Sequence, residues 1–321
     1  MSAKPKVLVT GSLGFIFSNF VRKAVYDKQP YQFVTLDKAV LPSSLNNMYF
    51  NKALASNYIA DITDAHIINR IFEFEKPDIV IHGAAESAVD NSIKNANVFI
   101  DNNVLGTQNL INASLKNNVK KFIMVSTDEI YGALKSESDS SWTEESPLNP
   151  RNPYSASKAA AELLVKAAHE THGLTYNITR SSNNYGPRQT PEKLIPRVIK
   201  CIMEKTPIPV YGQGMQIRDW THVLDNCEGI LSVLNNGKPN ETYNISANQE
   251  FTNIEVVHKI CEIMGEGMSL VKYVEDRPGH DFRYSINCDK IKSLGWSPQY
   301  KFKEGISETI DWFMSNRWSL K

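Results

Sequence analysis

Residues 7–17 read VLVTGSLGFIF, a short apolar run followed by a turn that contains Gly11 and Gly14. The run predicts a buried β-strand, and the turn opens a predicted helix over residues 15–27 that begins with Phe15 and Ile16. Glycine in such a turn lets the backbone approach a pyrophosphate, which the N-terminus of the helix stabilises. The stretch therefore predicts a dinucleotide site; the alternative is a plain tight turn.

Outward from this unit, the first half of the chain alternates β-branched runs with longer amphipathic stretches. We predict further strands over residues 33–36, 58–60, 78–82, 121–126 and 175–181. Helices are predicted over residues 64–75, 96–117 and 153–172. Strands that alternate with helices form βαβ units with right-handed crossovers. The expected fold class is therefore α/β, with a doubly wound parallel sheet of the Rossmann type.

After about residue 185 the segments shorten and Pro and Gly become more frequent. We therefore expect a Rossmann domain over residues 1–185 and a smaller ligand-binding domain over residues 186–321. The apolar spacing of 223–246 and 303–314 suits packing on the main sheet, so the two domains are expected to interleave.

Composition excludes several classes of protein. Among 321 residues, Lys+Arg and Asp+Glu both number 35, so the basic excess of a nucleic-acid binder is missing. No apolar stretch is long enough to span a membrane, and MSAKPK runs straight into the first strand, so we expect no signal peptide. The four cysteines and seven histidines show no metal-ligand spacing, so we expect no metal site and a reducing, cytoplasmic compartment.

Polar and small residues follow the predicted strands where a cofactor would lie. Asp37 can accept hydrogen bonds from adenosine ribose hydroxyls and would repel a 2′-phosphate, which favours NAD over NADP. Lys38 weakens that preference, and Asp37 could instead be a turn residue. Asp61 and Ile62 follow the third strand, near the expected adenine edge. The fourth strand is followed by Gly83, Ala84, Ala85 and Glu86.

Phe17 stands where the usual pattern has a third glycine, which allows close packing of helix and strand. Either the ring tilts the start of the helix, which would weaken NAD binding, or it turns into a nearby gap.

Two groups of residues carry candidate catalytic chemistry. Tyr154 and Lys158 lie one helical turn apart, and a lysine beside a phenol lowers the phenol pKa; the alternative is a solvated surface pair. Thr127, Asp128 and Glu129 end the fifth strand, at the edge where ligands bind. Of two carboxyl groups buried together one should keep its proton, which gives an acid beside a base; the alternative is a solvated loop.

The sequence resembles the dTDP-glucose 4,6-dehydratases, which are extended short-chain dehydrogenases/reductases. The resemblance covers residues 7–313 and rests on TGxxGFI, AAES, VSTDEIYG, PYSASKAAAE, RSSNNYGP, EKLIP, IRDW and DRPGHDFRY. The Asp-Glu pair after Thr127 separates this family from the related 4-epimerases. Departures from the pattern are Phe17, Gly83 and Arg188.

The resemblance implies NAD-dependent dehydration of an NDP-glucose, with dTDP or UDP as the nucleotide, to the 4-keto-6-deoxy sugar, a step toward deoxysugars such as rhamnose. Tyr154 would take the proton of the 4-hydroxyl, with Lys158 and Thr127 assisting. Glu129 would remove the C5 proton, and Asp128 would protonate the departing 6-hydroxyl.

The same resemblance implies further contacts. Asn102 and Asn184 would bind NAD together with Tyr154 and Lys158. The nucleotide sugar would contact Ser87, Thr127, Asn183, Lys193, Leu194, Arg218, Asn253, Asp276, Arg277 and His280. Without the resemblance, Arg218 could equally form a surface ion pair with Asp219 or Asp225.

The helices over 96–117 and 153–171 resemble those that build a homodimer in this superfamily. Two other functions remain open: an NDP-sugar 4-epimerase or decarboxylase, and a non-catalytic Rossmann binding protein.

Overall fold

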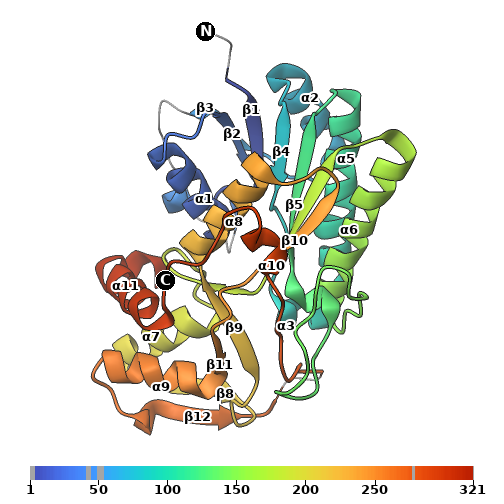
Figure 1. Cartoon of the computed structure of the whole chain (residues 1–321). Helices are drawn as coiled ribbons and strands as arrows, with labels where there is room; N and C mark the ends of the chain where they lie inside the picture. Colours follow the sequence, from blue (N-terminus) through green and yellow to red (C-terminus); the bar gives the residue numbers. More distant parts are fainter. Residues whose placement is uncertain (1–3, 41–44, 49–53, 277–278, 321) are drawn as a thin grey trace.

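The computed structural model describes residues 4–40, 45–48, 54–276 and 279–320 and is built around a seven-stranded sheet (Figure 1). The strand order is β10-β6-β5-β4-β1-β2-β3, and every neighbouring pair is parallel. The strands are β1 (Lys6–Thr10), β2 (Gln32–Asp37), β3 (Leu54–Ile59), β4 (Ile79–His82), β5 (Lys121–Thr127), β6 (Tyr176–Ser181) and β10 (Glu241–Ile245). The order of β1 to β6 is that of a doubly wound dinucleotide-binding sheet, so the predicted fold class is confirmed.

Alternate residues of each strand face opposite layers of helices. Val7 and Val9 of β1 enter the core beneath α1 (Phe15–Tyr26) and α8 (Val223–Asn236). Leu8 enters the core on the other face, against the layer formed by three further helices. These helices are α2 (Ala65–Glu75), α5 (Gly106–Lys116) and α6 (Pro153–His172). The strands are apolar on both sides because both faces are covered.

The predicted helix over 96–117 has a break in its hydrogen-bond pattern. It consists of α4 (Ala96–Phe99), a π-helical segment η2 (Ile100–Leu105) and α5, preceded by α3 (Val89–Lys94). Within η2, Asn103 accepts a hydrogen bond from Glu86 N and donates to Glu86 O and to Ser157 Oγ. The π segment thus turns Asn103 toward the loop after β4, a use of π-bulges that is common near functional sites.

The second half of the chain contributes to both parts of the molecule. The segment 223–246 supplies α8, which packs against α1, and β10, which extends the main sheet beside β6. The expectation that 303–314 packs on the main sheet is wrong. These residues form α11 (Phe302–Ser315), whose buried side chains lie in the separate core of the smaller part.

That smaller part, in the lower half of Figure 1, contains two short sheets and their helices. The sheets have the orders β11-β9-β7 and β12-β8. Their strands are β7 (Asn183–Tyr185), β8 (Ile208–Tyr211), β9 (Ile217–His222), β11 (Glu250–Thr252) and β12 (Val271–Val274). Over the whole described chain, the helical elements not yet mentioned are α7 (Leu194–Glu204), α9 (Asn253–Ile263), α10 (Asp289–Lys292), η1 (Leu45–Asn47), η3 (Asp128–Tyr131), η4 (Met268–Leu270) and η5 (Arg317–Leu320).

All four cysteines are buried and unpaired. Within the described ranges, no group of three or more His, Cys, Asp or Glu side chains is placed to hold a metal ion. No helix in the described part of the chain is both long and apolar enough to cross a membrane.

Candidate active site

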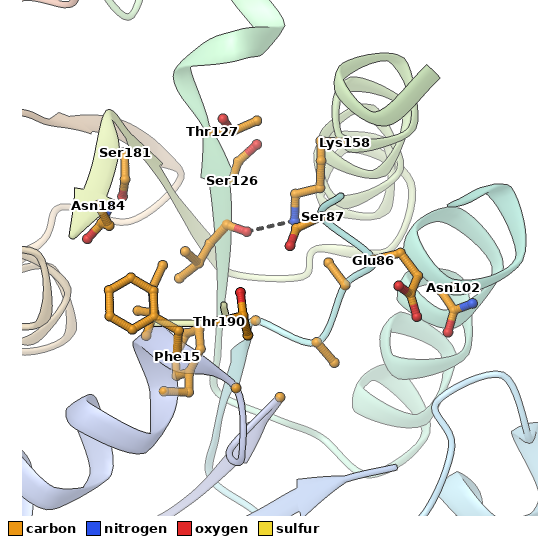
Figure 2. Close-up of a pocket in the computed structure, with 18 of the residues that line it drawn as sticks. Phe15, Glu86, Ser87, Asn102, Ser126, Thr127, Lys158, Ser181, Asn184 and Thr190 are labelled. Carbon is orange, nitrogen blue, oxygen red and sulfur yellow. Dashed lines mark hydrogen bonds between the residues drawn. The ribbon is translucent and has the colours of Figure 1, made fainter. Parts of the chain in front are cut away.

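A cavity of about 300 Å³ lies at the carboxyl edge of the main sheet, between the sheet and the smaller part of the molecule (Figure 2). Most of the predicted site residues line it: Gly11, Gly14, Phe15, Ile16, Asp37, Lys38, Ile62, Gly83, Ala84, Ala85, Glu86, Ser87, Asn102, Thr127, Asp128, Glu129, Tyr154, Lys158, Asn183, Asn184 and Lys193. The cavity is also lined by residues that the sequence analysis did not name as site residues: Phe17, Leu36, Val40, Ala60, Val125, Ser126, Ser181, Ser182, Gln189 and Thr190. Phe17 was considered only for its effect on helix packing, and Val125, Ser126, Ser181 and Ser182 were quoted only as parts of motifs. The others carry no motif, so only the fold brings them to the cavity.

The glycine turn after β1 is shaped for a close approach of another chain segment or ligand. Gly11 has φ +75°, and a Cβ there would lie 2.8 Å from the amide nitrogen of Ala84. Gly14 is the N-cap residue of α1 and leaves the helix N-terminus without a side-chain cap. The uncapped amides point at the cavity, so the turn fits the pyrophosphate of a dinucleotide.

The ring of Phe17 turns into a nearby gap, the second of the two arrangements that the sequence allowed. Its side chain is only 3% exposed, and its ring lies directly over Gly83 at the end of β4. A Cβ on Gly83 would lie 1.7 Å from a carbon of the ring, so Gly83 leaves the gap that the ring fills. The two departures from the family pattern therefore compensate each other, and α1 begins at Phe15 directly after the turn.

Asp37 and Lys38 have different partners at the end of β2. The Asp37 carboxylate accepts hydrogen bonds from the backbone amides of Leu13 (3.0 Å) and Ala39 (2.8 Å), which orients it beside the glycine turn. Lys38 Nζ donates to Glu86 Oε1 at 2.8 Å and to Asn102 Oδ1 at 2.9 Å. Glu86 and Asn102 both border the cavity in Figure 2. Glu86 therefore balances the charge of Lys38, and the Asp37 carboxylate is held by backbone amides rather than by Lys38.

The carboxyl groups after β5 lie in unlike surroundings. Asp128 is 3% exposed, and burial, followed by the neighbouring Glu129 carboxylate, raises the pKa of Asp128 well above its usual range. Asp128 Oδ1 accepts from Thr127 Oγ1 at 3.3 Å, whereas Oδ2 has no hydrogen-bond partner among the described residues. Glu129 is half-buried and accepts a hydrogen bond from Asn152 Nδ2 at 3.2 Å. Asp128 is therefore a buried carboxyl group with a raised pKa, directly beside the half-buried Glu129.

Tyr154 and Lys158 project from the first turns of α6 toward the same cavity. Lys158 Nζ donates to the carbonyl of Val125 at 2.8 Å, and burial lowers the pKa of Lys158 to about 8 (Figure 2). Burial, and then the Glu129 carboxylate, raises the pKa of Tyr154, while the Thr127 hydroxyl lowers it. The net shift of the Tyr154 pKa is therefore upward, opposite to the lowering by Lys158 that the sequence analysis expected.

Arg218 lies behind these residues and is not a surface group. It is 4% exposed and donates to the carbonyls of Ile217 (2.7 Å) and Asp281 (2.9 Å). Its guanidinium lies 4.2 Å over the ring of Tyr284. Burial, and then Glu129, raises the pKa of Tyr284, which places this phenol near Glu129. The sequence analysis quoted Tyr284 only as part of DRPGHDFRY.

Comparisons with known proteins agree with this geometry. The family model of GDP-mannose 4,6 dehydratase matches residues 8–309. A dTDP-glucose 4,6-dehydratase of Xanthomonas campestris is 43% identical over 97% of this chain and 93% of its own length. The low-salt glycan biosynthesis protein Agl12 of Haloferax volcanii is 42% identical over 97% and 99%. The crystal structure of DesIV, a dTDP-glucose 4,6-dehydratase of Streptomyces venezuelae with NAD and TYD bound, superimposes with a TM-score of 0.93 at 41% identity, covering 98% of both chains.

The chain belongs to the dTDP-glucose 4,6-dehydratase family. This membership favours the dehydratase over the epimerase and the non-catalytic alternatives.

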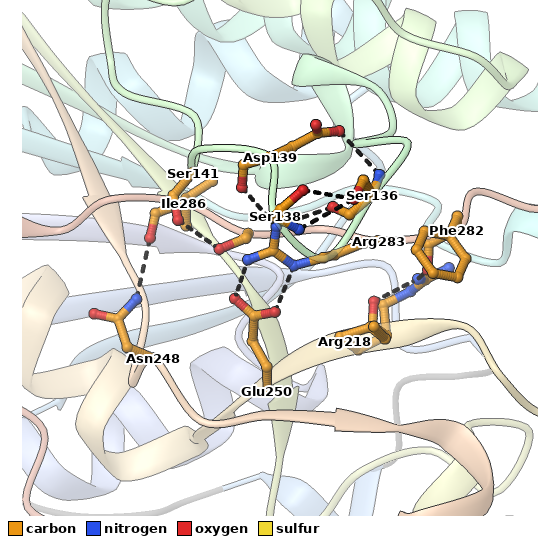
Figure 3. A network of polar contacts seen from close by, with 12 residues as sticks. Ser136, Ser138, Asp139, Ser141, Arg218, Asn248, Glu250, Phe282, Arg283 and Ile286 are labelled. Carbon is orange, nitrogen blue, oxygen red and sulfur yellow. Dashed lines mark hydrogen bonds and ion pairs between the residues drawn. The ribbon is translucent and has the colours of Figure 1, made fainter.

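In this dehydratase a polar network joins the smaller part to the loop between the two catalytic segments (Figure 3). Arg283 forms a bidentate ion pair with Glu250 at 2.6 and 2.9 Å and also donates to the carbonyl of Asp139 at 2.8 Å. Backbone bonds from Leu134 N to Arg283 O and from Trp142 N to Ser285 O run alongside. The loop that follows Glu129 is thereby attached to the chain segment that carries Tyr284.

Of the other predicted contacts, those that the structure describes do not line the cavity. Asp61 accepts from Thr63 N and Oγ1 in a local turn. Asn253 and Leu194 begin α9 and α7. Asp276 pairs with His280 at 2.6 Å and accepts from Gln216 at 2.9 Å. Arg277 lies outside the described residues. The predicted roles of these residues stay predictions.

Proposed function

We propose that this protein removes water from dTDP-glucose and forms dTDP-4-keto-6-deoxyglucose, with NAD as its bound cofactor. One observation carries the proposal: Asp128, a buried carboxyl group with a raised pKa, and Glu129 line the same cavity as Tyr154 and the glycine turn after β1. The names of the relatives and the NAD bound to DesIV support the substrate and the cofactor.

The first proton moves between the sugar and Tyr154. The phenolate of Tyr154 takes the proton of the 4-hydroxyl, and the Thr127 hydroxyl donates to the oxygen that becomes the ketone. Lys158 is held by Val125 O, and its charge favours the phenolate when substrate excludes water. NAD, when bound, accepts the hydride of C4 and later returns it to C6.

The elimination uses the two carboxyl groups. The 4-ketone acidifies the C5 hydrogen, which Glu129 removes as a proton. Asp128 donates its proton to the 6-hydroxyl, and the C6–O bond breaks to release water. After the hydride reaches C6, Glu129 returns its proton to C5. The proton taken by Tyr154 replaces the one that Asp128 gave up, so the net change is the loss of one water.

We further propose a division of labour along the chain. Residues 1–185 hold NAD, and 186–321 mainly hold the nucleotide sugar. The carboxylate of Asp37 and the pairing of Lys38 with Glu86 support NAD over NADP. The four buried, unpaired cysteines support a reducing cytoplasmic location. Exposed apolar side chains on α4, η2 and α6 support a homodimer.

The experiment follows one hydrogen. dTDP-glucose carrying deuterium at C4 is converted in the presence of catalytic NAD, and the product is analysed by NMR. We expect the deuterium at C6 of the 4-keto-6-deoxy sugar, with no free NADH. Release of the label into the NADH pool would disprove the proposal, and recovery of a C4 epimer without loss of water would show an epimerase. A parallel reaction with UDP-glucose tests the nucleotide.

A further inference from the structure

We infer that Asn152 is a positioning residue for the base, holding the Glu129 carboxylate toward the sugar. Asn152 Nδ2 donates to Glu129 Oε2 at 3.2 Å across the loop that separates η3 from α6. Both side chains are half-buried, and Glu129 lines the cavity. The inference rests on the proposed role of Glu129 as the C5 base.

The other end of the same amide caps a helix. Asn152 is the N-cap residue of α6, and its Oδ1 accepts a hydrogen bond from Ser155 N at 2.8 Å. Ser155 Oγ completes a capping box with the backbone of Asn152. One planar group thus joins the helix that carries Tyr154 and Lys158 to the carboxylate that follows β5. An acceptor for the helix and a donor for Glu129 are both required, and the asparagine amide supplies both.

The surroundings of Glu129 explain why it needs this donor. Asp128, Tyr154 and Tyr284 all lie close enough to Glu129 for its charge to raise their pKa values. The Asn152 amide is a neutral donor, so it fixes the rotation of the carboxylate without taking part in proton exchange. A hydrogen bond to a charged group of this kind is worth roughly 10- to 100-fold in a rate that depends on its geometry.

Because Asn152 also caps α6, a purely structural role must be separated from positioning. The two roles predict different steps. Damage to the cap would displace Tyr154 and slow oxidation at C4. Loss of the bond to Glu129 would leave that oxidation intact and slow the removal of the C5 proton.

The test uses Asn152→Ser and Asn152→Asp, which keep a good N-cap residue but remove the amide that donates to Glu129. Ser155→Ala is the matched control, since it weakens the capping box and leaves the amide facing Glu129. Rapid mixing with dTDP-glucose follows C4 oxidation by absorbance of the reduced cofactor, and exchange of C5 hydrogen with D₂O follows the base. Thermal unfolding reports the cap.

We expect C4 oxidation within about twofold of the parent for both Asn152 variants, and C5 exchange slowed roughly 10- to 100-fold. The aspartate variant should be the slower of the two, because a second carboxylate repels Glu129. Ser155→Ala should lower the unfolding temperature without this split between steps. Oxidation and exchange slowed equally by the Asn152 variants, or unchanged exchange, would overturn the inference.

A double mutant separates this inference from the proposed function. In a Glu129→Gln background the Asn152→Ser change should have no further effect on C5 exchange, because the two residues act through one contact. A further, multiplicative loss would overturn the positioning role while leaving Glu129 as the base. Full C5 exchange in Glu129→Gln alone would overturn the base, and this inference with it.

Discussion

At the scale of single residues, the active site depends on two adjacent carboxyl groups that burial makes unlike. In the proposed mechanism Asp128 is the neutral acid, in keeping with its raised pKa, and the charge of Glu129 is the largest cause after burial that raises the pKa of Tyr154. Glu129→Gln removes that charge, so the pKa of Tyr154 should fall. Because the phenolate is the reactive form, the rate of C4 oxidation rises with pH through this pKa. The rise should therefore move to lower pH in Glu129→Gln, while dehydration is lost.

Stopped-flow absorbance of the reduced cofactor, measured across neutral and alkaline pH, checks this shift. Asp128→Asn is the control, because replacing a neutral acid by an amide changes no charge. That variant should keep the parent pH profile for oxidation and slow the loss of water by roughly 10²–10⁴, the usual contribution of one general acid. An equal displacement of both profiles would contradict the different protonation of the two groups.

At the scale of elements, the packing of α1 on the main sheet depends on Phe17 and Gly83. The ring of Phe17 occupies the space that a side chain at Gly83 would otherwise fill. Gly83→Leu should clash with the ring, and Phe17→Gly should leave a cavity, which costs about 3–5 kcal/mol for loss of a buried Phe side chain. The double variant restores one large and one small residue. We expect it to be more stable than the two single losses predict, by about 0.5–3 kcal/mol in urea unfolding.

Strictly additive losses would show that the ring and Gly83 do not share one space. Calorimetric titration of NAD into the same proteins tests the cofactor site. Because α1 begins directly after the turn, the parent and the double variant should bind NAD equally well, and Glu228→Gln on the solvent side of α8 serves as a packing-neutral control.

Local patterns predicted the elements that need only their own residues. The strand at residues 7–10, the helix at 153–172 and the Tyr154–Lys158 spacing all follow from periodicity and turn chemistry. The compensation of Phe17 by Gly83 was not predictable, since it joins α1 to the end of β4. The π segment at Ile100–Leu105 was missed because its apolar pattern reads as an ordinary helix. Asn152 was not predicted as a site residue because the family pattern PYSASK begins one residue later.

At the scale of the whole molecule, the later part of the chain both completes the sheet and closes the site. β10 and α8 return to the main sheet, so the smaller part is connected to it by several crossings rather than one. Arg283 and Glu250 then attach the loop after Glu129 to the smaller part (Figure 3). Because the chain passes between the two parts several times, the main sheet and the smaller part are held in a fixed arrangement on either side of the cavity. A fixed arrangement suits a reaction that must move one hydrogen from C4 to C6.

One surface of the molecule, formed by α4, η2 and α6, carries exposed apolar side chains. Val98, Ile100 and Leu105 are 39–48% exposed along α4 and η2, and Leu163 on the adjoining α6 is 57% exposed. Helices α6 and η2 contact each other, so these side chains belong to neighbouring helices on one face of the sheet. Exposed apolar groups gathered on paired helices are typical of an interface, and a second copy of the chain is the proposed occupant.

Leu163→Arg should therefore dissociate the dimer, because an unpaired charge in a buried interface costs about 3–5 kcal/mol, a 10²-fold or greater weakening. Light scattering should find twice the chain mass of 36.2 kDa for the parent and the single mass for the variant. Tyr26→Glu is the control, because Tyr26 is 85% exposed at the end of α1, on the opposite face of the sheet. It should remain dimeric. A parent protein of single mass, or dissociation by both changes, would remove the paired-helix face as the interface.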